Sequence, residues 1–239
     1  MPVNTVASLR GRTVLVGGAT GELGAAVLAR LVALGAAVGV PVRKPWQVEK
    51  VRASCLTAKA LVGVVGPVDG EAAAGFAKGV HDALGPIDAL ITTQGAFQMA
   101  EAGRDAAGDM QALFEANVFA PLTLARAVVG PMKRRRAGAN VFTGAAAVGE
   151  VVPGMSLYLA AKSALHAAAA SWHAELSGQG VRVAVVAPGI LDTAANREAM
   201  PTADRSAWLP LDHVVEALIT AAFGTPVAAG PLFRVQGGG

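Results

Sequence analysis

The stretch VLVGGATGELGAAVLARLVALG, residues 14–35, joins an apolar β-rich run to a helical run through a glycine-rich turn. Gly18, Gly21 and Gly24 follow the spacing G-x-x-G-x-x-G, and glycines at this spacing let the backbone turn tightly. A helix that begins in such a turn presents its first N–H groups to a phosphate anion. The stretch therefore predicts a dinucleotide-binding turn. The alternative is a tight packing of strand and helix that binds no ligand.

The rest of the chain repeats this alternation of short β-rich runs and longer helical runs. Strands are expected at 13–17, 37–42, 60–65, 87–92, 139–143, 181–187 and 231–235. Helices are expected near 22–34, 70–84, 106–130, 156–178 and 212–223. Continuous apolar strands that alternate with helices are typical of a parallel sheet covered on both faces. The sequence therefore predicts a single α/β domain over residues 1–239, a Rossmann-like doubly wound parallel sheet in three α/β/α layers.

The longest expected irregular stretch, residues 188–211, follows the sixth expected strand. An open α/β sheet binds ligands at the carboxyl ends of its strands, and long loops at that edge are often functional. We therefore interpret residues of about 190–211 as a substrate lid. The candidate pocket-lining residues within it are Asn196, Arg197, Met200 and Trp208.

The composition favours a compact protein that acts on small molecules. Of the 239 residues, 53% are hydrophobic and 15% are charged, which suits a large core and argues against disorder. The formal net charge is +3, and the basic cluster KRRR at 133–136, with one tyrosine in the whole chain, does not predict nucleic-acid binding. Cys55 is the single cysteine, which excludes an internal disulfide and a cysteine-based metal cluster. Because neither a signal-peptide pattern nor a clear membrane span is found, we expect no membrane association and a cytoplasmic location.

The end of the second expected strand carries positive charge. In VGVPVRKP, Arg43 and Lys44 come directly after Val42, and no acidic residue follows until Glu49. In dinucleotide-binding folds an acidic residue about 20 positions beyond the glycines binds the ribose 2′-hydroxyl, whereas an arginine accommodates a 2′-phosphate. We therefore expect NADPH as the preferred cofactor, with NADH as the alternative. Solvated surface cations are the other interpretation.

The run PGMSLYLAAKSAL, residues 153–165, places a tyrosine four residues before a lysine. On a helix, positions i and i+4 share a face, so Tyr158 and Lys162 are expected side by side. A cation beside a phenol favours the phenolate, and we expect Lys162 to lower the pKa of Tyr158 from its usual value of about 10. Such a tyrosine would suit a proton donor that works near neutral pH. The structural alternative is a tyrosine on the core side of the helix with a solvated lysine.

With the glycine turn at one end and YLAAK at the other, the whole chain resembles the short-chain dehydrogenase/reductase family. The resemblance implies an NAD(P)H-dependent oxidoreductase in which Tyr158 transfers a proton, while Lys162 binds the nicotinamide ribose and depresses the tyrosine pKa. Asn117, in FEANVFAPLTLA, matches the asparagine that completes the family's proton relay through water. The further cofactor-binding positions that match the family's pattern are Gly95 in TTQG, Pro188, Gly189 and Thr193, whose family counterpart holds the carboxamide.

One position departs from the family's pattern. The family's catalytic serine usually lies thirteen residues before the tyrosine, where this chain has Ala145 in NVFTGAAAVGE. Alanine cannot donate a hydrogen bond to a carbonyl oxygen, and loss of such a donor can lower the rate about 10²–10³-fold. Thr143, two residues earlier on the same strand face, is a candidate substitute. The departure also leaves open a regulator that senses NADP(H) without catalysis.

The second half of the chain is most similar to the quinonoid dihydropteridine reductase branch of this family, which also lacks the serine. The similar segments are TGAAAVGEVVPGMSLYLAAKSALH at 143–166 and LDTAANREAMPTADRSAWLPLDHVVEAL at 191–218. The branch's tryptophan after the fourth strand would fall near Phe97, whose ring could stack against a flat pterin. The glycine turn is one residue longer than in that branch, and the acid that accompanies its NADH use is absent. The resemblance implies hydride transfer to a quinonoid dihydropterin or similar conjugated substrate, with another carbonyl or imine as the alternative.

Two expected helices, 106–130 and 156–178, are apolar over more of their circumference than one sheet face covers. The family resemblance implies that such surface is buried between subunits, so we expect a homodimer or homotetramer. His166 and His173 share a face of the second of these helices, but no cysteine or carboxylate at metal-site spacing accompanies them. We therefore expect a structural or interface role for both histidines, and no metal site.

Overall fold

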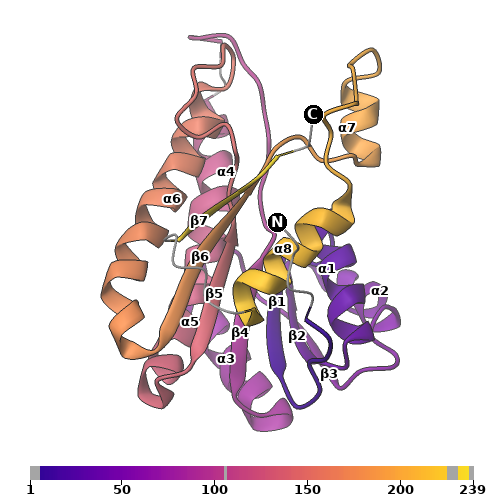
Figure 1. The fold of residues 1–239 in the computed structure, drawn as a ribbon, viewed down its shortest axis with the longest axis vertical. Helices are drawn as coiled ribbons and strands as arrows, with labels where there is room; N and C mark the ends of the chain where they lie inside the picture. The colour runs from indigo at the N-terminus through magenta and orange to yellow at the C-terminus, as the bar shows by residue number, and fades with distance from the viewer. Residues whose placement is uncertain (1–5, 105–106, 225–230, 237–239) are drawn as a thin grey trace.

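The computed structural model describes residues 6–104, 107–224 and 231–236. They form a seven-stranded sheet in which all neighbouring strands are parallel, in the order β3-β2-β1-β4-β5-β6-β7 (Figure 1). The strands are β1 Thr13–Gly17, β2 Ala37–Val42, β3 Ala60–Val64, β4 Ile87–Thr92, β5 Gly138–Thr143, β6 Val181–Pro188 and β7 Leu232–Val235. The expected doubly wound, Rossmann-like fold is confirmed.

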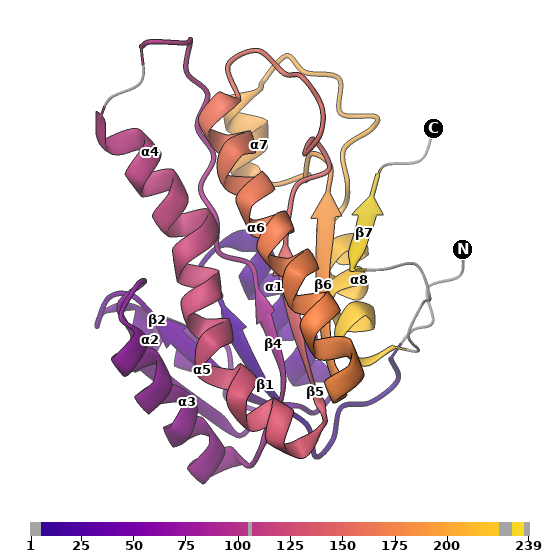
Figure 2. The same ribbon diagram turned by 90° about the vertical axis from the view of Figure 1, so that its left-hand side faces the viewer.

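Helices cover both faces of the sheet, which gives the three expected layers (Figure 2). They are α1 Glu22–Ala33, α2 Gln47–Ala53, α3 Gly70–Leu84, α4 Ala107–Phe114, α5 Ala120–Arg135, α6 Ser156–Leu176, α7 Ala194–Ala199 and α8 Leu211–Phe223. α1, α2 and α8 pack on one face through a core that includes Val27 and Leu218. α3, α5 and α6 pack on the other face through a core that includes Val80 and Leu165.

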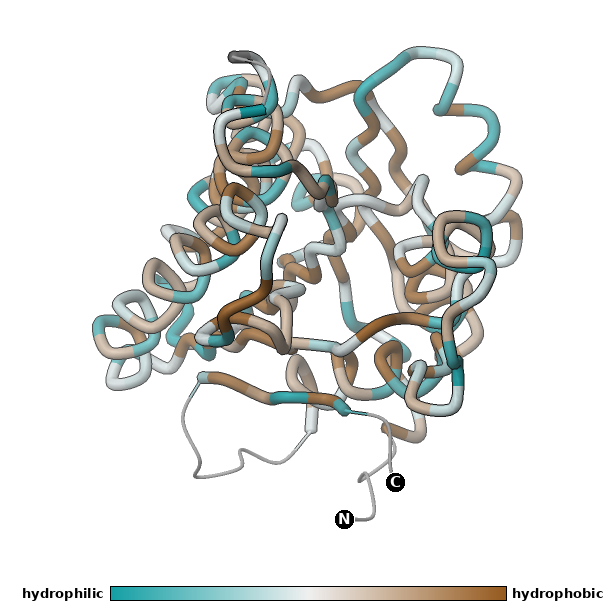
Figure 3. Tube along the Cα trace, turned by 90° about the horizontal axis from the view of Figure 1, so that it is seen from above, coloured by the Kyte–Doolittle hydropathy of each residue, from teal (hydrophilic) through white to brown (hydrophobic). Residues whose placement is uncertain are grey.

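The strands are buried because helices cover both of their faces. All five residues of β1 and five of the six residues of β5 are buried. Seen from above, the hydrophobic segments gather in the interior of the molecule (Figure 3). Burial on both faces explains why these strands are continuous apolar runs in the sequence and do not alternate with polar residues.

Two short helices differ from the expected element pattern. α2 lies where no element is expected, because only Gln47 and Val51 of its seven residues are buried and its apolar periodicity is weak. α7 lies inside the stretch 188–211 that is expected to be irregular. None of its six residues is buried, so it has no apolar stripe that periodicity could reveal.

The long helix expected at 106–130 extends to Arg135 and is interrupted by a π-helical turn, Glu115–Phe119. Within the described part of the chain, the run Gly108–Arg135 has the length and hydropathy of a membrane-spanning helix. Buried helices of other folds pass the same test, and this run packs on the sheet through Leu124 and Val128. It is therefore a core helix of this fold.

The order of the sheet reverses between β1 and β4, and this reversal locates the candidate site. β1 leads into α1 on one face, whereas β4 leads toward α4 and α5 on the other. Open α/β sheets bind ligands where two such connections part. The starts of α4 and α6, together with α7, lie above this carboxyl edge (Figures 1 and 2).

Candidate active site

The glycine turn between β1 and α1 has the geometry of a phosphate-binding turn. Gly18 has φ +85°, a left-handed backbone conformation that favours glycine. A Cβ at position 24 would lie 2.1 Å from the Gly18 carbonyl oxygen, so Gly24 lets the helix pack on the turn. A Cβ at position 21 would meet no atom nearer than 3.7 Å, and Gly21 is exposed. Two glycines thus shape the turn, while Gly21 leaves the helix N-terminus open to a ligand.

The same turn fits a dinucleotide. The N-cap residue of α1, Gly21, provides no side-chain hydrogen bond, so the helix N-terminus keeps N–H donors for an anion. Gln94 Oε1 is buried beside Gly17 and has no hydrogen-bond partner among the described residues. Gln94 is a polar group that sequence reasoning missed, although it directly precedes Gly95 in TTQG. Both features would be satisfied by a bound cofactor with phosphates and hydrogen-bond donors.

Arg43 and Lys44 follow β2 with exposed side chains. Their backbone N–H groups donate to Oε1 of Gln47, at 3.1 Å and 3.0 Å. Gln47 is buried at the start of α2, and its side chain therefore holds the backbone of Arg43 and Lys44 in place. Sequence reasoning missed Gln47, because its role depends on a side-chain direction. Both backbone N–H groups are thus occupied. The positive charge that this corner presents to solvent comes from the Arg43 and Lys44 side chains.

Tyr158 and Lys162 lie on α6, and Nζ of Lys162 is 6.0 Å from the centre of the Tyr158 ring. The ammonium group donates to the carbonyl oxygen of Thr143 at the end of β5, at 3.0 Å. Lys162 is buried, and burial lowers its pKa to about 8. The shared face expected from the spacing is present, and the alternative interpretation of a solvated lysine is excluded by the burial of Lys162.

The expected lowering of the tyrosine pKa is wrong for this arrangement. Burial raises the pKa of Tyr158 to about 12. The physical reason is that loss of water disfavours the phenolate, while the Lys162 ammonium is directed toward the Thr143 carbonyl. The hydroxyl of Tyr158 therefore keeps its proton at neutral pH.

Asn117 occupies the π-helical turn and is fully buried. Its Nδ2 donates to the carbonyl oxygens of Ala96 and Leu113, both at 2.9 Å, and its Oδ1 accepts from the N–H of Ala96 at 3.3 Å. π-helical turns widen a helix locally and are frequent at functional sites. Here the wide turn lets Asn117 bind the loop that follows β4.

Gly95 lies where these groups meet. A Cβ at this position would be 2.9 Å from Asn117 Oδ1 and 3.3 Å from Lys162 Nζ. The glycine therefore permits the close approach of the β4 loop to both side chains. Asn117, Lys162 and Gly95, which the sequence predicts separately, are brought together at the carboxyl edge of the sheet.

Ala145 and Thr143 do not supply a hydroxyl to the site. Thr143 is buried, and its Oγ1 donates to the Thr92 carbonyl oxygen on the neighbouring strand at 2.8 Å. Its proposed substitution for the missing serine is therefore wrong, because the hydroxyl hydrogen is already used within the sheet. The N–H of Ala145 donates to Nε2 of His166 at 3.3 Å.

The His166 ring also lies against Gly144, where a Cβ would be 2.2 Å from Nε2. Burial, followed by the charges of Lys162 and Arg234, lowers the pKa of His166 from 6.5 to about 4. The histidine is thus a neutral acceptor at neutral pH. The structural role expected for His166 is to fix the loop that carries Ala145, through the contact of its ring with the Ala145 N–H.

Phe97 stands beside the candidate proton donor. Its ring meets the Tyr158 ring edge to face, with centroids 5.0 Å apart and planes at 80°. Phe97 is 59% exposed, so most of its surface remains available for a substrate. Phe97 therefore lies next to Tyr158, and its role toward a substrate stays a prediction.

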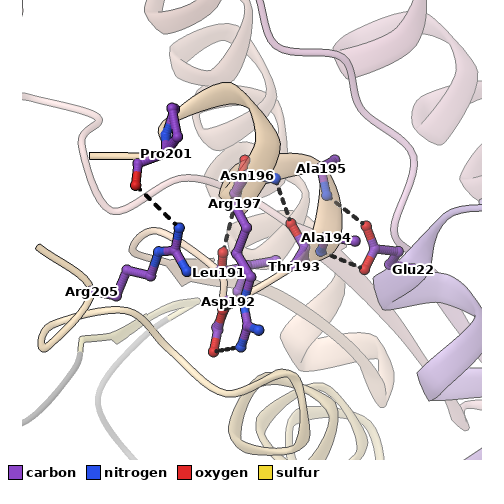
Figure 4. A network of polar contacts seen from close by, with 10 residues as sticks. All are labelled: Glu22, Leu191, Asp192, Thr193, Ala194, Ala195, Asn196, Arg197, Pro201 and Arg205. Atoms are coloured by element: carbon purple, nitrogen blue, oxygen red, sulfur yellow. Dashed lines mark hydrogen bonds and ion pairs between the residues drawn. The ribbon is translucent and has the colours of Figure 1, made fainter. Parts of the chain in front are cut away.

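The chain runs from the end of β6 into the expected lid, which contains α7. Pro188 is buried and its carbonyl oxygen accepts from the N–H of Ala146, while the N–H of Gly189 donates to the Val235 carbonyl oxygen. Thr193 is the N-cap residue of α7, and its Oγ1 accepts from the N–H of Asn196 at 3.1 Å (Figure 4). These contacts fix the path of the chain above the sheet.

The lid candidates differ in what their side chains contact. Asn196 Nδ2 donates to the Leu191 carbonyl oxygen at 2.8 Å, so its amide serves the lid itself. Trp208 is buried, and the Arg205 guanidinium lies 5.4 Å from its ring centre. Met200 is half-buried at the end of α7, and its side chain forms no hydrogen bond within the described residues.

Comparison with known proteins identifies the family. Residues 12–204 match the family model described as short chain dehydrogenase. The 2,3-dihydro-2,3-dihydroxybenzoate dehydrogenase of Escherichia coli is 36% identical over 111 residues, which are 46% of this chain and 45% of that protein. The cyclic-di-GMP-binding biofilm dispersal mediator protein of Escherichia coli is 30% identical over 196 residues, 81% of this chain and 79% of that protein. A solved structure described as a short chain dehydrogenase/reductase family protein has a TM-score of 0.85 and 26% identity over 97% of this chain and 98% of that chain.

The first of these relatives is matched over about half of its own length. The family model covers most of this chain, and the solved structure shows the same fold over nearly all of it. Family members are oxidoreductases that use NAD(P)(H) and act on small molecules. The chain belongs to the short-chain dehydrogenase family.

Proposed function

We propose that this protein is an NADPH-preferring reductase of a quinonoid dihydropterin or a similar conjugated substrate. The observation that carries the proposal is the set of groups around Ala145. The chain has alanine where the family's pattern has serine, and the hydroxyl of Thr143 donates to the Thr92 carbonyl oxygen. A site that lacks this hydroxyl donor is poorly built to polarise a carbonyl, whereas an electron-poor conjugated substrate mainly needs a proton nearby.

The proton would come from Tyr158. Its pKa of about 12 means that the hydroxyl is protonated at neutral pH and can act as an acid. Lys162, held by the Thr143 carbonyl oxygen, would hold the nicotinamide ribose and favour the tyrosinate that forms after proton transfer. Asn117 would order the β4 loop and connect the tyrosine to solvent through water. Bound NADPH would supply the hydride.

The cofactor preference rests on the corner after β2. Arg43 and Lys44 are exposed there, and no carboxylate is present before Glu49 to bind a 2′-hydroxyl. Because Gln47 already accepts from both backbone N–H groups, recognition of a 2′-phosphate falls to the cationic side chains. Arginine is suited to this task because its planar fork of donors matches phosphate oxygens.

The substrate class rests on Phe97 and on the lid. Phe97 is a largely exposed ring next to Tyr158, and an aromatic face there can stack on a flat bicyclic substrate. The resemblance of residues 191–218 to the dihydropteridine reductase branch supports the same class. Met200 and Trp208 would contribute apolar surface from the lid side.

The proposal includes a homodimer or homotetramer in the cytoplasm. Supporting it, a groove along α4, α5 and α6 is lined by apolar side chains and by polar ones in equal number, the apolar ones including Phe119, Leu122 and Trp172 and the charged ones Glu115 and Arg126. Phe119 is 48% exposed on this face. Such a face is suited to pairing with the same face of a second copy.

The test is steady-state oxidation of NADPH and of NADH with a quinonoid dihydropterin generated in the cuvette and the non-enzymic rate subtracted. We expect turnover that favours NADPH. Tyr158→Phe should lower turnover about 10²–10⁴-fold, because the general acid is lost, and should leave NADPH binding unchanged. Absence of turnover with both cofactors, in a protein that binds NADPH, would reject the pterin and direct the assay to other carbonyl or imine substrates.

The second candidate is a dinucleotide-sensing regulator without catalysis. The missing hydroxyl donor at Ala145 favours it, and so does the likeness to a relative named for binding cyclic-di-GMP. The Tyr158→Phe variant discriminates between the two. A regulator would bind NADPH equally well with and without the substitution and would show no turnover in either form.

A further inference from the structure

Glu22 joins two segments that are 172 residues apart in the sequence. It is the first residue of α1, within the glycine-rich turn. Its Oε2 accepts from the N–H of Ala194 at 3.0 Å, and its Oε1 accepts from the N–H of Ala195 at 3.2 Å (Figure 4). One carboxylate thus binds both leading amides of α7 and connects the lid to the turn.

α7 depends on polar contacts of this kind. None of its residues is buried, so apolar packing contributes little to its position. Inside the segment, Arg197 forms a paired contact with Asp192, with N···O distances of 2.6 Å and 2.7 Å, and Thr193 caps the helix. These contacts make the segment a compact unit but do not attach it to the rest of the protein. The Glu22 carboxylate provides an attachment to α1.

The charge of Glu22 has a second consequence at the cofactor site. Under the proposed function, the cofactor's pyrophosphate lies at the N-terminus of α1, where Gly21 leaves the amides open. Glu22 is the next residue along the chain, so a bound pyrophosphate would bring further negative charge to the end of α1 that carries this carboxylate. Like charges so placed repel each other.

We propose that Glu22 is a determinant of dinucleotide affinity: its carboxylate docks the lid helix α7 on the glycine turn and opposes the cofactor phosphates. Binding of the dinucleotide then releases the carboxylate from Ala194 and Ala195. This inference rests on the proposed function for the location of the cofactor. It concerns affinity for the pyrophosphate, which NADPH and NADH share, and is independent of the substrate.

The substitution Glu22→Gln tests the charge, since it keeps the shape of the side chain. Glu198→Gln is the matched control, because Glu198 is an exposed carboxylate on α7 itself and forms no hydrogen bond or ion pair with α1 in the described structure. We expect Glu22→Gln to lower the dissociation constants of NADPH and NADH alike, by about fivefold, the size of one screened charge–charge contact. Glu198→Gln should leave both constants unchanged.

Hydrogen exchange gives a readout that does not depend on activity. In protein without added dinucleotide, the amides of Ala194 and Ala195 should be protected, and Glu22→Gln should speed their exchange while Glu198→Gln does not. Addition of NADPH to the unsubstituted protein should also speed their exchange. Unchanged exchange in Glu22→Gln would overturn the docking role, and unchanged or weaker dinucleotide binding would overturn the opposing charge.

The two readouts also separate this inference from the proposed function. If the unsubstituted protein and both variants bind no dinucleotide, the proposed function fails and the affinity role of Glu22 fails with it, while amide exchange still decides whether Glu22 docks α7. If the dinucleotides bind and the dihydropterin is not reduced, only the substrate assignment fails. Neither measurement on Glu22 would change in that case.

Discussion

Lowering the pH should destabilise this protein through His166. The Nε2 atom of this residue accepts from the N–H of Ala145, and it can do so only when neutral. Burial, followed by the nearby charges of Lys162 and Arg234, lowers the His166 pKa from 6.5 to about 4. Above a pH of 6.5 the ring is neutral in the folded and the unfolded chain. Below it the unfolded chain binds a proton that the folded chain does not, so the free energy of unfolding falls as the pH falls toward 4.

The size of the effect follows from the two pKa values. At about 1.36 kcal/mol per pKa unit, the full shift corresponds to about 3 kcal/mol. The ring of His166 is half-buried, so solvent screens part of this energy. We therefore expect a loss of about 1 kcal/mol between about pH 7 and about pH 5 from this residue. Carboxylates with lowered pKa values, such as Asp192 and Asp204, contribute at lower pH.

The assay is urea unfolding of the unsubstituted protein and of His166→Gln at both pH values, at one protein concentration. Glutamine does not titrate in this range, and its amide oxygen can still accept from the Ala145 N–H. The loss of unfolding free energy on acidification should therefore be about 1 kcal/mol smaller in the variant. An equal loss in both proteins would refute the assignment of this pH dependence to His166.

Two further predictions concern the cofactor end. Arg43→Ala should weaken NADPH binding about tenfold or more and leave NADH binding nearly unchanged, because a charge-assisted contact to the 2′-phosphate is lost. Titration with both cofactors measures the two dissociation constants. Equal effects on both constants would contradict the role of Arg43. Gly24→Ala should destabilise the fold by about 1–3 kcal/mol, because the new Cβ would lie 2.1 Å from the Gly18 carbonyl oxygen. Gly21→Ala, whose Cβ would have space, is the control for thermal unfolding, and equal melting temperatures of the two variants would speak against the packing role of Gly24.

The fold is predictable from the sequence because its main signals are local. The expected strand 37–42 coincides with β2, since a strand buried on both faces is a continuous apolar run. Apolar periodicity does not reveal the short helices α2 and α7, because polar contacts hold them in place. Gln47 accepts from the corner before α2, and the Thr193 hydroxyl caps α7. Periodicity does not record such contacts.

The residues of the site are predictable, but the directions of their side chains are not. Spacing places Tyr158 and Lys162 on one face, as the structure has them. It does not reveal that the ammonium group turns to the Thr143 carbonyl oxygen or that burial raises the tyrosine pKa. The contact of Glu22 with α7 joins distant parts of the chain, and the π-helical turn at Asn117 has no sequence period of its own. Such features depend on the packed structure as a whole.

The polar groups at the carboxyl edge share one property that bears on the chemistry. The Lys162 ammonium, the Thr143 hydroxyl and the Asn117 amide all donate to backbone carbonyl oxygens. The Tyr158 hydroxyl has no hydrogen-bond partner within the described part of the chain, so it remains able to donate to a substrate. Under the proposed function, this proton donor beside an exposed aromatic ring suits a flat substrate that needs one proton, and it suits a carbonyl that needs two donors less well. The neutral His166 ring supports this arrangement, because it holds Ala145 in place without adding a second acidic group.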